Sequence, residues 1–129
     1  MKYLGVDFGR KRIGVALSDD EGRLAFPERV IDGTNLERSV DKILGLIRER
    51  NIRALVVGIP PEVSGMDSSL RESILAFGGV LEKKTGLPVS FENEMFTSKI
   101  ADLQGGNKND ASAAALILQS FLDRTNRIE

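Results

Sequence analysis

The sequence predicts an α/β fold in which one five-stranded mixed sheet is flanked by helices, in the order βββαβαβα. Two observations carry this prediction. Three strand patterns at the start of the chain are joined by turns of about four residues, which are too short for a crossover and indicate an antiparallel meander. Helical and strand patterns then alternate, as they do where helices connect parallel strands. We expect residues 1–129 to form a single domain.

The meander is predicted from its apolar strand patterns and its polar turns. Residues 2–8, 13–18 and 23–31 have strand patterns, and glycine-containing polar segments separate them. Pro27 cannot donate a hydrogen bond to a neighbouring strand, so we expect the third strand at an edge of the sheet.

The first crossover begins at Thr34. Thr34 and Glu37 have the spacing of a capping box, in which each side chain caps the backbone of the other residue. Apolar residues at helical spacing follow as far as Ile47. Residues 54–59 are then a continuous apolar run, which is typical of a buried parallel strand.

The second crossover repeats this pattern. Ser69 and Glu72 again have capping-box spacing, and Gly86 is typical of a helix end. The elements expected after it are a strand at residues 88–93, a short helix near 97–104 and a final helix at 110–124.

The composition limits the chemistry that the chain can perform. It contains no histidine and no cysteine, which excludes disulfides, zinc–thiolate sites and catalysis by histidine. A metal would have to be held by oxygen ligands, which favours Mg²⁺, Mn²⁺ or Ca²⁺. No apolar run approaches the roughly 20 residues that span a bilayer, and the first residues lack the pattern of a signal peptide. We therefore expect a cytoplasmic protein that does not bind membranes.

Three carboxylates occupy positions at which a charge needs an explanation. Asp7 lies inside an apolar strand, Glu94 directly follows the fifth strand, and Asp110 begins the last helix. Each has a purely structural interpretation. Asp7 could cap the turn at Gly9, and Asp110 could cap its own helix. Glu94 could lie with Glu92 along an exposed edge of the sheet.

Together the three carboxylates are more informative. In the predicted topology the first, fourth and fifth strands are neighbours at the sheet centre, so Asp7 and Glu94 would lie close together. The last helix could bring Asp110 to the same point. Carboxylates that converge within a few ångströms repel one another unless a divalent cation neutralises them. The pattern therefore predicts a metal site.

Motifs spread over nearly the whole chain resemble those of the YqgF/RuvX family of ribonuclease H-like proteins. The matching segments are 7–18 (DFGRKRIGVALS), 56–60 (VVGIP), 85–89 (TGLPV), 93–98 (NEMFTS), 110–119 (DASAAALILQ) and 122–123 (LD). The resemblance implies a ribonuclease H-like fold and a hydrolase that matures the 5′ end of pre-16S rRNA in ribosome biogenesis. It also implies that Asp7, Glu94 and Asp110 form the catalytic and metal-binding site.

The chemistry implied by these ligands is hydrolysis of nucleic-acid phosphodiesters with two metal ions. Asp7, Glu94 and Asp110 would hold two Mg²⁺ or Mn²⁺ ions, which clamp the scissile phosphate and activate water. The basic residues after the first strand would contact flanking phosphates or simply form a solvated turn; they are Arg10, Lys11 and Arg12.

The chain departs from the family motif on both sides of Glu94. Asn93 stands in place of the usual aspartate and Met95 in place of the usual arginine, which removes a cation expected near the phosphate. The loop over residues 62–69 also lacks the family's NMDG motif. Glu62 in that loop is either a reserve ligand or an ordinary loop residue.

Other functions stay open at this point. The chain could be a Holliday-junction resolvase that acts on branched DNA, or a nucleic-acid-binding module whose catalysis is weakened. An actin- or sugar-kinase-like phosphotransferase also begins with an aspartate on a first hairpin, although such proteins need two domains. The nuclease interpretations take pre-rRNA or branched DNA as the partner, and they fit a monomer or a homodimer.

Overall fold

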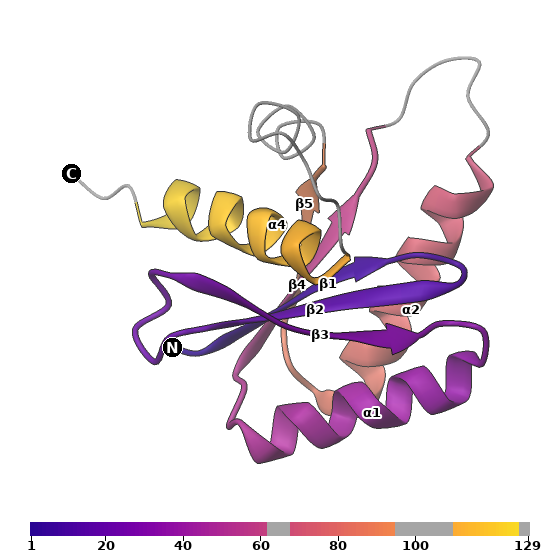
Figure 1. Ribbon diagram of the computed structural model, residues 1–129, viewed down its shortest axis with the longest axis horizontal. Coiled ribbons are helices and arrows are strands. Elements are labelled where there is room, and N and C mark those ends of the chain that lie inside the picture. The colour runs from indigo at the N-terminus through magenta and orange to yellow at the C-terminus, as the bar shows by residue number, and fades with distance from the viewer. Residues whose placement is uncertain (62–67, 95–109, 127–129) are drawn as a thin grey trace.

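The computed structural model describes residues 1–61, 68–94 and 110–126, with only the backbone of Asp110. Five strands form one sheet in the order β3-β2-β1-β4-β5, and helices cover both of its faces (Figure 1). The strands are β1 (Tyr3–Phe8), β2 (Arg12–Ser18), β3 (Ala25–Asp32), β4 (Ala54–Ile59) and β5 (Val89–Asn93). The helices are α1 (Leu36–Glu49), α2 (Ser69–Thr85) and α4 (Asp110–Thr125). The predicted order is confirmed over the described residues.

The sheet is mixed, as predicted. β1 pairs antiparallel with β2 and β2 with β3, whereas β1 and β5 both pair parallel with β4. β3 lies at one edge, which agrees with the position expected for Pro27. The expectation that the fifth strand lies near the sheet centre is wrong, because α2 returns the chain to the outer side of β4 and leaves β5 at the other edge.

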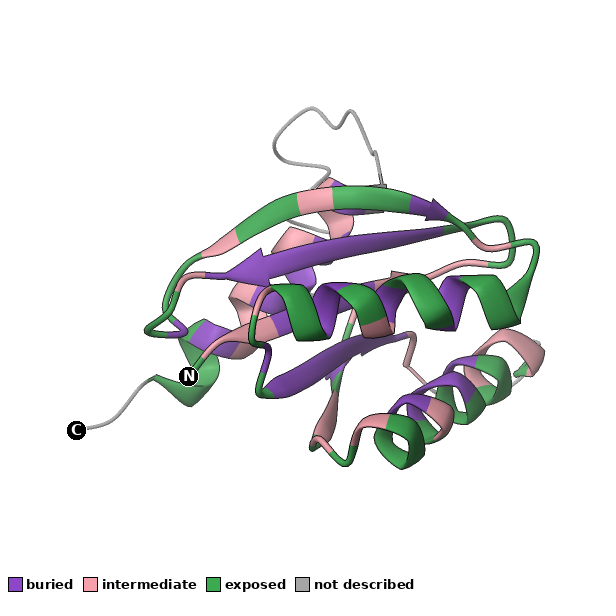
Figure 2. Ribbon diagram, turned by 90° about the horizontal axis from the view of Figure 1, so that it is seen from below, coloured by how far each residue is buried: buried purple, intermediate pink, exposed green. Residues whose placement is uncertain are grey.

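The larger core lies between the sheet and the two helices α1 and α2. Alternate residues of the central strands point to this face and meet the apolar sides of both helices. Figure 2 shows the buried side of α1 facing the sheet, while β3 is mostly exposed. At the end of β1 the ring of Phe8 packs on Phe77 of α2, with 4.7 Å between their centroids. This contact holds α2 beside the carboxyl end of β1.

Among the described elements, α4 covers the other face and approaches the sheet closely. Phe121 packs on Tyr3 with 5.7 Å between the ring centroids. Further along β1, a Cβ added to Gly5 would lie 2.8 Å from the Cβ of Leu118 and 3.3 Å from the carbonyl oxygen of Ala114. Going toward the start of α4, its residues therefore pack against residues progressively nearer the carboxyl end of β1. The start of α4 points toward the carboxyl end of β1.

Both predicted capping boxes take other forms. The residue that caps α1 is Asn35, whose side chain accepts a backbone N–H of the first turn at 3.0 Å. Thr34 instead donates its hydroxyl to Asp32 at 2.7 Å. Ser69 lies inside α2, and its hydroxyl accepts a hydrogen bond from the Arg10 guanidinium at 2.7 Å. Arg10, in the turn between β1 and β2, thus binds the hydroxyl that the spacing predicts as a local helix cap.

The short helix predicted near residues 97–104 lies outside the described residues. None of the described helices combines the length and the apolar character needed to cross a membrane.

Candidate active site

Asp7 lies near the carboxyl end of β1, the central strand of the sheet. Side chains alternate along a strand, so Asp7 shares with Gly5 the face that α4 covers. The residue is half-buried. Its partner on β2 is Gly14, which has no side chain to cover the carboxylate. The strand pattern thus places a charge on the α4 face beyond the close contact of helix and sheet.

Glu94 follows β5 directly and is held to the neighbouring strand by its backbone. Its N–H donates to the carbonyl oxygen of Ile59 at 3.0 Å. The side chain lies over Gly58, where an added Cβ would be 2.8 Å from Glu94 Oε1 and 3.2 Å from its Cγ. The same Cβ would be 2.5 Å from Ile117 of α4. A glycine at this position of β4 therefore makes the space in which the Glu94 carboxyl lies.

Asp7 and Glu94 are brought together by this arrangement. Burial, the negative charge of Asp7 and a hydrogen bond to its side chain raise the pKa of Glu94 from 4.5 to about 7. Only a protonated carboxyl has an O–H to donate, so below about pH 7 the pair shares a proton when no cation is bound. Asp7 is therefore more than a turn residue, because its carboxylate is part of a coupled acid pair.

The third predicted acid begins α4. The backbone of Asp110 starts the helix at the end that points toward the carboxyl end of β1, while its side chain lies outside the described residues. Within the part of the chain that the structure describes, no group of three acids is placed to hold a metal. The role of Asp110 therefore stays a prediction. Glu62 and Met95 also lie outside the described residues.

Glu92 is not part of an exposed edge, and that interpretation of Glu92 and Glu94 is wrong. Glu92 is 4% exposed, on the α4 face of β5. Ser120 of α4 donates its hydroxyl to Glu92 Oε2 at 2.9 Å, and the Arg124 guanidinium pairs with Oε1. Arg124 also lies over the Phe121 ring, 5.5 Å from its centroid. In the sequence, the position of Glu92 is indicated only by its spacing of two residues from Glu94, which places both on one face of the strand. That spacing does not distinguish a buried edge position from a solvated one.

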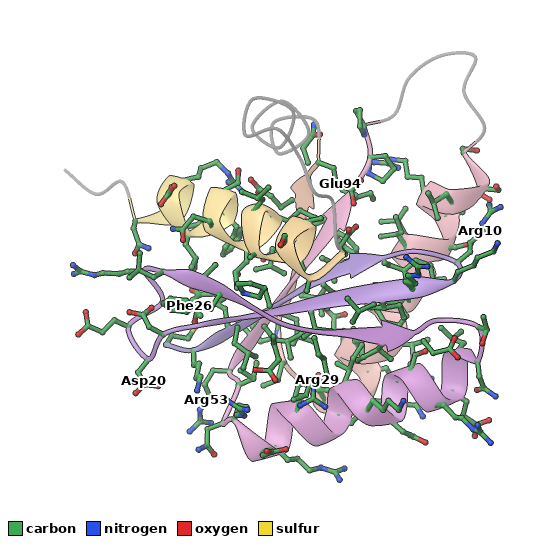
Figure 3. All side chains as sticks on the ribbon, viewed as in Figure 1. Arg10, Asp20, Phe26, Arg29, Arg53 and Glu94 are labelled. Carbon is green, nitrogen blue, oxygen red and sulfur yellow. The ribbon has the colours of Figure 1, made fainter. Side chains whose placement is uncertain are left out.

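The basic turn between β1 and β2 lies at the end of the sheet that carries Asp7. Gly33 fixes its shape by donating its N–H to the carbonyl oxygen of Lys11 at 2.8 Å. Arg10, Lys11 and Arg12 are all exposed. In Figure 3 Arg10 lies beside the start of α2, and Glu94 lies near the start of α4. The structure thus leaves these cations open to solvent, which fits both the phosphate-contact and the solvated-turn interpretation.

Comparison with known families decides the membership of the chain. A sequence model described as "RuvX: Holliday junction resolvase" matches residues 1–124. The chain belongs to the RuvX family. A relative from Nitratidesulfovibrio vulgaris, named "Putative pre-16S rRNA nuclease", is 38% identical over 133 residues, which cover 95% of this chain and 94% of the relative. A protein of the same name from Trichormus variabilis is 37% identical, with 95% and 89% covered.

Solved structures give the fold of this RuvX chain. RuvC from Thermus thermophilus, in complex with a Holliday junction substrate, has a TM-score of 0.64 at 20% identity, over 100% of this chain and 98% of that chain. The predicted family and the ribonuclease H-like α/β class are therefore confirmed. The kinase-like alternative is set aside, because the family that matches nearly the whole chain is a different one.

Proposed function

We propose that this RuvX-family chain is a metal-dependent nuclease that hydrolyses phosphodiester bonds, with the 5′ region of pre-16S rRNA as its substrate. The single observation that carries the proposal is the acid pair of Asp7 and Glu94, which are joined by a hydrogen bond where β1 and β5 end. A pair of half-buried carboxylates is unfavourable unless it serves a cation or a proton.

The family supports the class of reaction. Its model is described as a Holliday junction resolvase, and relatives at 37% and 38% identity are named as pre-16S rRNA nucleases. Both names describe hydrolysis of nucleic-acid phosphodiesters, which is the enzyme class expected from the sequence. The relatives that cover most of both chains favour RNA over branched DNA. The likeness to RuvC at 20% identity carries the fold alone.

The donor set of the site fits a hard divalent cation. Asp7 and Glu94 offer only oxygen ligands, which Mg²⁺ and Mn²⁺ prefer. The raised pKa of Glu94 reflects burial and the unneutralised charge of Asp7, and a cation between the carboxyls would remove that repulsion. We assign Asp110, at the start of α4, as the third ligand. Three such carboxylates suit two ions.

Bound divalent metal would lower the pKa of the attacking water and neutralise charge on the phosphate. The protein's own residues would hold the metal ligands and the substrate phosphates in position. The backbone of Glu94 is tied to β4 through Ile59, and its side chain is walled by Ile117 of α4, so the carboxyl has little freedom. Glu94 would have to release its shared proton in order to bind a metal. At the same end of the sheet, Arg10, Lys11 and Arg12 would hold the flanking phosphates.

A direct assay tests the function. Purified protein is incubated with a transcript that spans the 5′ leader of 16S rRNA, or with a four-way DNA junction, in Mn²⁺ or Mg²⁺. We expect cleavage of the transcript that Asp7→Asn and Asp110→Asn reduce by orders of magnitude. Asp20→Asn is the matched control, because the Asp20 side chain is 95% exposed, away from the site (Figure 3).

The result also separates the remaining alternatives. Cleavage of the junction but not of the transcript would replace the RNA substrate by branched DNA, as the family description allows. Binding without cleavage, in the parent protein and in a Met95→Arg variant that restores the family's cation, would identify a binding module and contradict the nuclease proposal.

A further inference from the structure

A pocket lies close to the acid pair, but on the face of the sheet that α2 covers. It has a volume of about 410 Å³ and opens where β4 and β5 end. We call it the edge pocket; its main lining residues are Pro60, Pro61, Arg71, Leu75, Phe91 and Asn93. Its volume lies within the roughly 300–1,000 Å³ that is typical of small-molecule sites.

The edge pocket and the acid pair share one rim of the sheet. Asn93 lines the pocket and directly precedes Glu94. The carbonyl oxygen of Ile59, which accepts the Glu94 N–H, directly precedes Pro60 at the pocket wall. Side chains alternate along β5, so Phe91 and Asn93 face α2 whereas Glu94 faces α4. A chain that crosses this rim would pass from the acid pair into the pocket.

The apolar wall of the pocket presents an aromatic ring. Phe91 packs on Gly78 of α2 so closely that an added Cβ there would lie 2.6 Å from Phe91 Cζ. The helix therefore supports the ring, yet Phe91 remains 37% exposed and Leu75 beside the same pocket 40% exposed. A supported, half-exposed ring is the arrangement on which unpaired nucleic-acid bases stack.

The polar part of the pocket is cationic. Arg71 of α2 contributes a guanidinium whose buried Nε has no hydrogen-bond partner in the described part of the chain. A buried N–H without a partner is costly, so an acceptor is expected there. None of the described lining residues is acidic. A phosphate oxygen satisfies both the charge and the missing acceptor.

We propose that the edge pocket receives one unpaired nucleotide of the substrate, with its base on Phe91 and its phosphate on Arg71. The proposal rests on the proposed nuclease function and adds to it a requirement for single-stranded nucleic acid beside the scissile bond. An apolar peptide would cover the ring but would leave the Arg71 cation without an anion, whereas a nucleotide supplies both a base and a phosphate.

The sequence contains no tryptophan, so a single introduced indole serves as a fluorescence reporter. Phe91→Trp introduces a single indole in the edge pocket, and Phe26→Trp introduces one on the opposite edge strand, where Phe26 is 53% exposed (Figure 3). Both changes are made together with Asp7→Asn to prevent cleavage. We expect single-stranded RNA to quench the emission of the Phe91→Trp protein and to leave that of the Phe26→Trp protein unchanged. Blunt duplex RNA should quench neither.

Affinity and its salt dependence test the two contacts separately. Phe91→Ala should raise the Kd for a single-stranded oligonucleotide about tenfold, as loss of one stacked base does, while Phe91→Leu, which keeps an apolar wall, should fold normally and show a similar loss. Arg71→Gln should make the slope of log K against log salt shallower by about 0.7, the value for one phosphate contact of a single strand. Arg53→Gln removes an exposed arginine next to the other end of β4 and should leave the slope unchanged.

Unchanged emission of the Phe91→Trp protein on saturation with RNA, while the parent protein still cleaves its substrate, would overturn the edge-pocket proposal and leave the nuclease intact. Failure of the parent protein to bind or cleave any nucleic acid would overturn both proposals. An emission change that follows protein concentration alone, with dimers in sedimentation, would show that a second copy fills the pocket and would also overturn the proposal.

Discussion

The carboxyls of Asp7 and Glu94 share a hydrogen bond across β4, a strand to which neither residue belongs. Asp7 lies on β1 and Glu94 follows β5, so both side chains must reach over the strand between them. β1 pairs with β4 as far as Val57, which puts Gly58 next to Asp7 in the sheet. The acid pair thus exists because the residue between the two carboxyls has no side chain.

Gly58→Ala should therefore damage the site without touching either acid. The new Cβ would lie 2.8 Å from Glu94 Oε1 and 2.5 Å from Ile117, so the carboxyl or α4 must move. We expect cleavage to fall by about tenfold to a hundredfold and stability by about 1–3 kcal/mol. Cleavage rates and urea unfolding measure the two effects.

Gly45→Ala is the matched control for this glycine. Nothing lies within 4 Å of a Cβ at Gly45 of α1, and alanine is the better helix former. This variant should be more stable by about 0.5–1 kcal/mol and equally active. Full activity in Gly58→Ala would show that the Glu94 carboxyl does not need the position it has here.

The raised pKa of Glu94 makes stability depend on pH in the metal-free protein. The native carboxyl keeps its proton up to about pH 7, whereas an unfolded glutamate loses it near 4.5. The native state thus binds more protons in this interval, and stability falls as the pH rises through it. We expect a loss of about 1–2 kcal/mol between pH 4.5 and pH 7 after allowance for solvent screening. Glu94→Gln should flatten this part of the profile, measured as Tm in EDTA; a steep profile in that variant would assign the effect to other groups.

Divalent metal should reverse that loss. A cation at about ten times its Kd stabilises the native state by about 1.4 kcal/mol, so Mn²⁺ should raise Tm by roughly 3–6 °C. The increase should be larger at pH 8 than at pH 5, because the ligand must be deprotonated. At pH 8, where both carboxyls are ionised, Asp7→Asn should raise Tm without metal through relief of repulsion, and it should abolish the response to Mn²⁺. Asp20→Asn should behave like the parent, and an equal response in Asp7→Asn would exclude Asp7 as a ligand.

Local patterns were sufficient to predict the sheet and its helices from the sequence. The alternation along β1 identified Asp7 as an anomaly because charge is rare inside an apolar strand. The predicted topology brought Glu94 and Asp110 toward Asp7, and the motif resemblance then implied that the three acids form one site.

Contacts between distant segments account for what the sequence did not predict. The Arg10 guanidinium donates to the Ser69 hydroxyl, which the sequence pattern had placed in a helix cap. Arg124 of α4 pairs with Glu92 on β5, an edge strand whose acids the sequence allowed to be solvated. The edge position of β5 likewise depends on where α2 returns the chain. Such choices follow from packing between elements, which a single sequence does not record.

The pair of Glu92 and Arg124 should respond asymmetrically to substitution, because one partner is buried and the other is not. The Glu92 side chain is 6% exposed and that of Arg124 60%. Arg124→Gln leaves a buried carboxylate without its cation and should cost about 1–3 kcal/mol. Glu92→Gln removes the charge but keeps an acceptor for Ser120, and it leaves Arg124 in solvent, so it should cost less than about 1 kcal/mol. Urea unfolding of the two variants, with Arg53→Gln as the control for loss of an exposed arginine, measures the difference. Equal costs would show that the ion pair itself, and not the burial of Glu92, sets how firmly α4 is held to β5.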